Sequence, residues 1–262
     1  MLSRDALEEI RPLKKSRGQA FIIGAFFLIA AGAIPSQAED VTIVFRVWGA
    51  DWERVATHYY SATKVRFDQG EQVTVVDFKT GRIVNISVKK KEYSETTFAE
   101  IEQAMNSVSA EMEKAMAGIP EGLRKKMVGD SAKEVTISRG EGRTVASIPC
   151  QTYIVALGEK TRMETCVTLE LDLPFDKSQF RNLALVTAPI AKGNSGINKM
   201  VEKLRDIEGL SLASATVVSL MGKKLETWSE ATAIRKGKVA NELFETPHDF
   251  RKVDSPFAKT AH

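Results

Sequence analysis

Two short motifs in the sequence contain the residue types of a serine hydrolase. Ser61 and Lys64 match S-x-x-K, and residues 79–81 match K-T-G; both motifs belong to the signature set of serine β-lactamases. In that chemistry the serine starts a helix, so the lysine lies one turn away on the same face. Residues 58–67, HYYSATKVRF, instead predict a strand, in which positions three apart point to opposite faces. The sequence also has no S-D-N motif, and we predict that the protein is not an enzyme.

The histidines show no spacing typical of a metal site. The sequence contains His58, His248 and His262, without HExxH or HxH, and it contains neither G-x-G-x-x-G nor a P-loop. We interpret His58 as a residue on the surface of a strand and the other two as tail residues. Residues 192–196, KGNSG, could hold an anion before a helix, but a turn between helices is the simpler interpretation. We therefore predict no metal and no cofactor.

An apolar stripe rich in methionine is the most informative candidate site. Between residues 97 and 118, apolar residues recur every three or four positions, which predicts an amphipathic helix. Methionine is flexible and polarizable, so it suits a surface that adapts to varied apolar partners. The stripe could pack in the core, or it could face a ligand as a lid. The candidate lining consists of Phe98, Ile101, Met105, Val108, Met112 and Met116.

The two cysteines are predicted to form one structural disulfide. Residues 157–160, LGEK, read as the turn of a hairpin, and that turn places Cys150 and Cys166 opposite each other or nearly so. Free buried thiols are one alternative. A redox-active pair is another, although such pairs usually have a close spacing such as CxxC.

The first 38 residues are typical of an export signal. Basic residues precede a fifteen-residue apolar run over 20–34, and Ser36-Gln37-Ala38 predicts cleavage after Ala38. An uncleaved membrane anchor is the alternative, but fifteen helical residues span only about 22 Å, less than a bilayer core. No cysteine follows the run, so lipid attachment there is excluded. We expect a periplasmic protein with no stable membrane span after cleavage.

Removal of this segment changes the charge of the protein. The full chain of 262 residues has a formal net charge of +3. Residues 1–38 hold five Lys or Arg and three Asp or Glu, which leaves 32 positive and 31 negative residues in the remainder. A nearly neutral protein lacks the basic surface that nucleic-acid binding requires. We therefore exclude nucleic acid as a partner.

The elements that position these residues alternate between strands and two helical stretches. Turn signals about every ten residues predict an antiparallel meander at the start of the mature chain. A capping box at Thr97 begins the first helix, and Pro120 ends it. The predicted strands are 41–48, 55–60, 63–68, 71–78, 82–89, 134–139, 145–157, 161–171, 211–220 and 225–235. The predicted helices are 97–118, 121–128, 177–188 and 196–206.

Four sequence segments resemble an uncharacterised family of exported bacterial proteins that carries a domain of unknown function. The segments are HYYSATKVRFDQG from residue 58, VVDFKTGRIVNISVKKKEY from residue 75, SIPCQTYIVALGEKTRMETCV from residue 147 and LFETPHDFRKVDSP from residue 243. The resemblance covers about residues 41–255, and the order of the segments carries it. That family is in turn similar to the lipoprotein-localisation carriers and periplasmic sensors.

This resemblance implies an α+β fold with a strongly curved antiparallel sheet, a half-open β-barrel. Two helical insertions would pack on its concave face, and the methionine-bearing helix would act as a lid or plug. We thus expect a signal peptide over 1–38, one carrier-like domain over 39–255 and a polar tail over 256–262. The expected function is non-enzymatic binding of a lipid or acyl chain; the alternative is a cell-envelope sensor or protein-interaction module with an envelope protein as its partner.

Overall fold

The computed structural model describes residues 38–120, 134–158, 161–187, 195–220 and 223–257. The chain divides into two compact units, Met1–Ser36 and Gln37–His262, and all of the described residues belong to the second. Apart from Ala38, the predicted signal peptide lies outside the described residues. The short helix predicted over 121–128 lies outside them as well.

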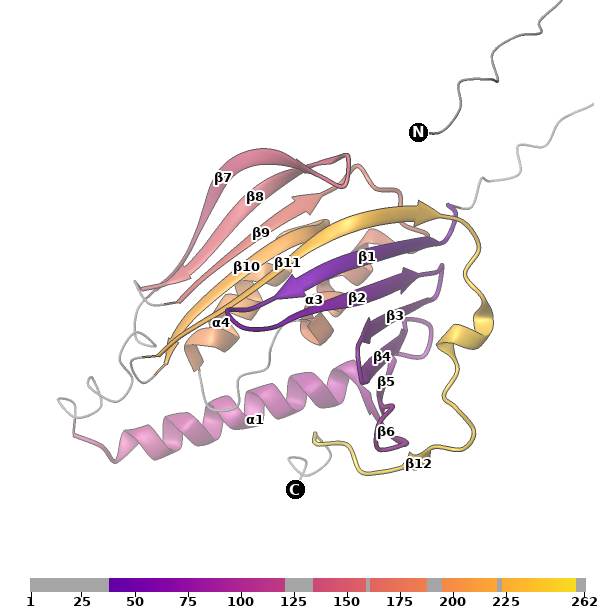
Figure 1. Ribbon diagram of the computed structural model, residues 1–262. Helices are drawn as coiled ribbons and strands as arrows, with labels where there is room; N and C mark the ends of the chain where they lie inside the picture. Colours follow the sequence, from indigo (N-terminus) through magenta and orange to yellow (C-terminus); the bar gives the residue numbers. More distant parts are fainter. Residues whose placement is uncertain (1–37, 121–133, 159–160, 188–194, 221–222, 258–262) are drawn as a thin grey trace, which may run out of the picture. The chain divides into compact units, whose positions relative to one another are not determined.

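A large, open and mostly antiparallel sheet dominates the described part of the chain (Figure 1). Its strand order is β12-β6-β5-β4-β3-β2-β1-β11-β10-β9-β8-β7, and only the short β12 pairs in parallel, with β6. The strands are β1 (Val41–Trp48), β2 (Glu53–Tyr60), β3 (Lys64–Gln69), β4 (Gln72–Asp77), β5 (Arg82–Ser87), β6 (Glu92–Thr97), β7 (Val135–Val145), β8 (Ile148–Leu157), β9 (Thr161–Thr168), β10 (Leu210–Leu220), β11 (Lys223–Lys236) and β12 (Arg251–Lys252).

The helical elements lie in two of the connections between strands and near the C-terminal end. Helix α1 (Phe98–Ala117) lies between β6 and β7 in the chain. Three described helical elements lie between β9 and β10, namely η2 (Lys177–Gln179), α3 (Phe180–Thr187) and α4 (Ser195–Arg205). A short 3₁₀ helix, η3 (Asn241–Phe244), follows β11. In Figure 1, α3 and α4 lie beneath the arch of the sheet.

The first six strands form the predicted meander, with one more strand than the sequence suggested. Gly70 and Gly81 occupy tight turns with φ of 72° and 69°, values that glycine adopts without strain. Residues 92–97 form β6, which we did not predict because EYSETT lacks an apolar alternation. Helix α1 follows at once. Its capping box is present: the Thr97 amide donates to Glu100 Oε2 at 2.8 Å, and the Glu100 amide donates to Thr97 Oγ1 at 3.2 Å.

The strand boundaries around β7 and β8 correct the sequence prediction. A strand break was expected after residue 139, yet β7 continues to Val145 through an irregularity between Arg139 and Gly142. The turn falls instead at Ala146 and Ser147, whose φ values of 47° and 67° are those of a two-residue hairpin turn. Neither residue is the glycine or asparagine that usually reveals such a turn in a sequence, so the break was misplaced.

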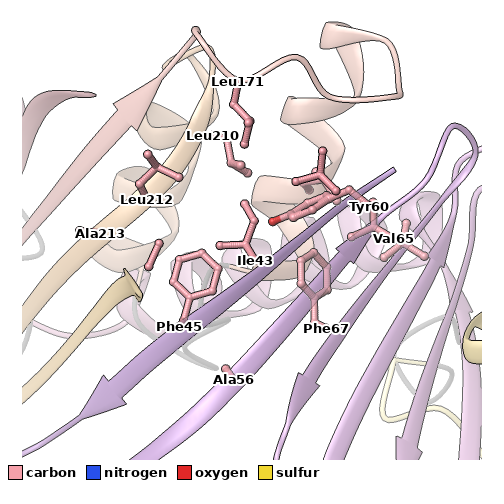
Figure 2. Close-up of a cluster of buried hydrophobic side chains, with 14 of the residues drawn as sticks. Ile43, Phe45, Ala56, Tyr60, Val65, Phe67, Leu171, Leu210, Leu212 and Ala213 are labelled. Carbon is pink, nitrogen blue, oxygen red and sulfur yellow. The ribbon is translucent and has the colours of Figure 1, made fainter. Parts of the chain in front are cut away.

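The two faces of the sheet are covered by different parts of the chain. We call inner face the one that carries Phe45, His58 and Phe67, and outer face the opposite one. On the inner face, residues of β1–β5 pack with Ile101 of α1 and Leu183 of α3 in the main core. Figure 2 shows the part of this core that contains Phe45, Tyr60 and Phe67. Further along this face, α4 contacts β7 and β8, and its fully buried Met200 packs with Val155 and Leu157.

On the outer face, a second core lies over β4 and β5. Four buried residues of these strands meet the chain that follows β11, through Val239 and Phe244. The four are Val73, Val75, Val84 and Ile86. This explains why the meander strands have apolar residues at both alternating sets of positions. Beyond residue 255, the partly buried Phe257 packs against the main core.

Candidate functional site

A partly open cavity of about 300 Å³ lies on the inner face, between the sheet and the helical segment that carries α3 and α4. This volume is at the lower end of the range of small-molecule sites, roughly 300–1,000 Å³. Strands β1–β3 supply one wall, strands β9–β11 supply another, and Leu183, Leu204 and Ile207 contribute from the helical segment. The lining residues are Phe45, Val47, His58, Tyr60, Phe67, Met163, Glu164, Thr165, Val167, Leu183, Leu204, Ile207, Gly209, Leu210, Ser211, Ser214, Thr216 and Ser229.

The first wall consists of aromatic side chains from three neighbouring strands. Their order follows from the register, since His58 of β2 lies opposite both Ile43 of β1 and Phe67 of β3. The His58 ring centroid lies 4.5 Å from that of Phe45 and 4.7 Å from that of Phe67, the latter edge-on. Figure 2 shows Phe45, Phe67 and Tyr60 projecting from adjacent strands toward the region of Leu210.

His58 and Tyr60 form an uncharged polar pair within this aromatic wall. The His58 Nδ1 and the Tyr60 hydroxyl share a hydrogen bond of 3.3 Å. Burial lowers the pKa of His58 to about 3, because the surrounding protein removes the water that would stabilise an imidazolium. Burial also raises the pKa of Tyr60, so both side chains are neutral at pH 7. The sequence-based interpretation of His58 as a surface residue was therefore wrong: it faces the cavity.

The opposite wall carries a row of hydroxyl groups from β9, β10 and β11. Thr165 donates a hydrogen bond of 2.8 Å to Ser211, whose hydroxyl donates to the Ala213 carbonyl at 3.2 Å. Ser214 and Ser229, which lie directly opposite each other on β10 and β11, share a bond of 2.9 Å. The hydroxyl groups of this wall are thus polar but uncharged.

Gly209 brings the start of β10 close to β9 at the edge of the cavity. Its φ is +118°, and a Cβ at this position would lie 2.5 Å from a Val167 side-chain atom and 2.6 Å from the Thr168 carbonyl oxygen. Only glycine can adopt this φ value and also leave room for the Val167 side chain and the Thr168 carbonyl. The sequence pattern gives no sign of this close approach.

Only two of the six residues of the methionine-bearing stripe on α1 can be compared with this cavity. Ile101 is buried in the main core, and Phe98 packs against the same core; neither lines the cavity. The backbone of α1 is described, but the side chains of the other four residues lie outside the described part. These are Met105, Val108, Met112 and Met116. Whether the stripe contacts a ligand stays a prediction.

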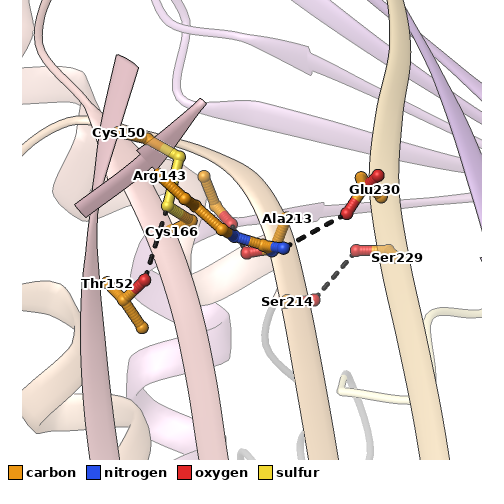
Figure 3. Close-up of polar contacts among 9 residues, drawn as sticks. Arg143, Cys150, Thr152, Cys166, Ala213, Ser214, Ser229 and Glu230 are labelled. Carbon is orange, nitrogen blue, oxygen red and sulfur yellow. Dashed lines mark hydrogen bonds and ion pairs between the residues drawn. A yellow bond between two sulfur atoms is a disulfide. The ribbon is translucent and has the colours of Figure 1, made fainter. Parts of the chain in front are cut away.

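The cysteine pair lies on the other side of the same sheet half. Cys150 and Cys166 form a disulfide with a Cα–Cα distance of 5.4 Å, in agreement with the predicted pairing. Thr152 lies directly opposite Cys166, so the cysteines are diagonal neighbours across β8 and β9. Figure 3 shows this bond beside Arg143, which reaches from β7 to Glu230 of β11 with an Nη1–Oε2 distance of 3.3 Å. Together these contacts tie β7–β9 to β11.

The two hydrolase-like motifs form turns. Ser61 Oγ accepts the Lys64 amide at 3.1 Å and donates to the Lys64 carbonyl at 3.0 Å, which closes the turn between β2 and β3. The amides of Lys79 and Thr80 both donate to Asp77 Oδ1 at the turn between β4 and β5. Within the described residues, no cluster of three or more His, Cys, Asp or Glu side chains could hold a metal ion.

Comparison with known proteins gives distant structural similarities only. No family model matches the chain, and no curated protein matches it. An uncharacterised conserved protein from Thermus thermophilus is similar over 83% of this chain and 91% of its own, with 10% identity and a TM-score of 0.41. A chain of the MucA/MucB complex of Pseudomonas aeruginosa is similar over 83% of this chain, with 10% identity and a TM-score of 0.40.

A lipoprotein-sorting domain is also among the similar structures. This outer-membrane lipoprotein-sorting domain from Vibrio parahaemolyticus is similar over 78% of this chain and 89% of its own, with 8% identity and a TM-score of 0.25. The present chain spans only 59% of the matched chain in the MucA/MucB complex. At these TM-scores the similar structures assign neither a ligand nor a function to this chain. No helix among the described residues is long and apolar enough to cross a bilayer.

Proposed function

We propose that this protein is a non-enzymatic periplasmic protein that binds a hydrophobic ligand, a lipid or an acyl chain, in the inner-face cavity. The observation that supports the proposal most directly is the cavity itself, an unfilled space of about 300 Å³ beside the main core. A partly open space of this size between a sheet and a helical segment is typical of a small-molecule binding site.

The composition of the walls supports an apolar occupant. Phe45 and Phe67 line one side, and Leu183 and Leu204 line the helical side. Each methylene group that a ligand buries against such surfaces contributes about 0.8 kcal/mol. The proposed site lies beside α3 and α4, whereas the sequence pattern placed it beside α1. Any residues of α1 that contact the ligand would extend the lining of this cavity.

The test is binding of the uncharged apolar dye N-phenyl-1-naphthylamine, whose fluorescence rises in an apolar environment. We expect saturable binding to the mature protein, and at least a tenfold loss of affinity in Thr216→Phe. Thr216 lines the cavity, so a phenyl ring there occupies the space.

A neighbouring residue of the same strand provides the matched control. Ala215 lines a hollow on the outer face and is not among the residues that line the inner-face cavity, because successive residues of a strand alternate in direction. Ala215→Phe should leave dye binding unchanged. Loss of binding in Ala215→Phe but not in Thr216→Phe would place the dye on the outer face and refute the proposal. Absence of dye binding and of co-purified lipid in native mass spectra would refute it entirely.

The alternative, a protein-interaction module, would use the sheet edge formed by β7. Among the described strands, β7 has a neighbour on one side only. However, its irregularity near Gly142 and its charged residues Arg139, Glu141 and Arg143 are features that discourage the addition of another strand. We therefore rank ligand binding first. A specific protein that co-purifies with the chain, without any lipid, would reverse this order.

A further inference from the structure

The cavity contains polar groups that an acyl chain alone would not need. We propose that the site selects lipids with an uncharged, hydrogen-bonding head group, such as an acylglycerol, over anionic lipids of the same chain length. This inference rests on the proposed function, since it specifies the ligand of the same cavity.

The charges around the cavity do not suit an anion. Among the described lining residues there is no lysine or arginine, and the only one with a formal charge is Glu164. That carboxylate forms an ion pair with Arg162 on the same strand. A carboxylate or phosphate brought into the cavity would lose water without gaining a cationic partner, which is strongly unfavourable.

The cation on the neighbouring helix is already engaged. Arg205 follows the lining residue Leu204 at the end of α4, and its guanidinium binds Glu102 of α1 at 2.9 Å. Arg205 is not among the residues that line the cavity. Its Nη2 is paired with Glu102, while its buried Nε has no hydrogen-bond partner among the described residues.

The neutral pair on the aromatic wall can still accept and donate hydrogen bonds. A neutral histidine has one N–H and one unprotonated nitrogen, and a tyrosine hydroxyl both donates and accepts. The bond between His58 and Tyr60 uses one donor and one acceptor. One donor and one acceptor therefore remain, and they suit a hydroxyl or ester carbonyl of a ligand.

The hydroxyl wall offers a second set of neutral contacts. Ser214 and Ser229 share a single hydrogen bond, and one of their two hydroxyl hydrogens is not used in it. This pair and the His58–Tyr60 pair both line the same 300 Å³ space. A glycerol head group, with several hydroxyls on adjacent carbons, can bond to such dispersed neutral groups, whereas a carboxylate only accepts.

The experiment compares 1-monolauroylglycerol with laurate at pH 7.4, below their micelle concentrations. Each displaces N-phenyl-1-naphthylamine from the mature protein, and the two have the same acyl chain. We expect monolauroylglycerol to bind at least tenfold more tightly. Tyr60→Phe and His58→Phe should each lower its affinity about tenfold, because each removes a hydrogen-bonding group. Dye affinity is measured for each variant as well, and the lipid affinity is compared with it.

Tyr59→Phe is the matched control, because Tyr59 packs on the outer face with the second core. It should change neither affinity. Equal or tighter binding of laurate, or an unchanged preference in both Tyr60→Phe and His58→Phe, would refute the inference while dye binding continues to support the cavity. If the dye and both lipids fail to bind, and native mass spectra show no monolauroylglycerol adduct, the proposed function fails as well. Circular dichroism and dye binding report whether each variant is folded.

Discussion

The two faces of the first half of the sheet are built from the same strands but are completed differently. On the outer face, Val75 and Val84 are covered by Val239 and Phe244, and the resulting core is continuous. On the inner face, Phe45 and Phe67 belong to the main core, and a partly open cavity of about 300 Å³ lies beside them. Over β4 and β5 the outer face is closed by the chain itself, whereas the inner face has a cavity beside β1–β3.

The polar groups of the two faces also differ in what they bind. The outer segment is fixed by bonds that hold its backbone, such as the Val239 amide to Asp40 and the Arg66 guanidinium to the Leu243 carbonyl. On the inner face, His58, Tyr60 and the hydroxyl wall direct polar atoms into the space. An apolar alternation in a strand therefore shows that a face is buried, but not whether protein or a ligand covers it.

The largest expected effect is the loss of the aromatic residue that closes the outer face. Phe244→Ala should lower the free energy of unfolding by about 3–5 kcal/mol, because it leaves a void in a packed core. Leu204→Ala, at the half-buried cavity wall, should cost less than about 2 kcal/mol, because the site already contains space. Urea unfolding measures both. Similar losses in the two variants would contradict the distinction between a closed face and an open one.

Removal of the disulfide should have the next largest effect. The double variant Cys150→Ala/Cys166→Ala should be about 3 kcal/mol less stable, since the bond closes a loop with a sequence separation of 16. The disulfide joins β8 and β9 behind the hydroxyl wall of the cavity. Dye affinity should therefore fall only if the position of these hydroxyl groups depends on the disulfide. Reduced wild-type protein should match the variant in urea unfolding. No change on reduction would indicate that the bond is not formed in the exported protein.

The pH dependence of stability tests the burial of His58. An unfolded histidine binds a proton near pH 6.5, whereas the folded pKa is about 3. Between these values the unfolded chain binds more protons, so the folded state loses stability as the pH falls. From pH 7 to pH 5 this group should cost the wild type about 2 kcal/mol. His58→Phe should lack this part of the slope, whereas an outer-face variant, Tyr59→Phe, should retain it.

The smallest expected effect concerns the cap of α1, next to the inner face. Thr97→Ala removes a hydroxyl that accepts the Glu100 amide and should cost about 1 kcal/mol. Hydrogen bonds from Thr97 and Thr96 hold the pKa of Glu100 below its usual range, so the cap should weaken as that carboxylate is protonated in acid. Thermal unfolding of Thr97→Ala and Thr97→Ser measures the effect, and serine should preserve most of the stability. If dye binding is unchanged, α1 is not needed for the cavity.

Local patterns predicted much of the secondary structure, and the errors have specific causes. The glycine turns, the capping box at Thr97 and the pairing of the cysteines depend on short stretches of chain, and the structure has them where expected. The turn at Ala146 and Ser147 was missed because these residues adopt positive φ values without the usual residue types. Strand β6 was missed because its polar sequence is stabilised by pairing with β5, which is a tertiary effect.

The candidate site shows more clearly which features depend on short stretches of sequence and which depend on the tertiary structure. The sequence by itself determined that the chain starts with a meander of strands, that an amphipathic helix follows it and that Cys150 and Cys166 can pair. Only the tertiary structure decided that His58 points into a cavity and that the cavity lies beside α3 and α4 rather than in contact with Phe98 and Ile101. The physical reason is that periodicity fixes which residues share a face, whereas the packing of distant segments decides which face is filled.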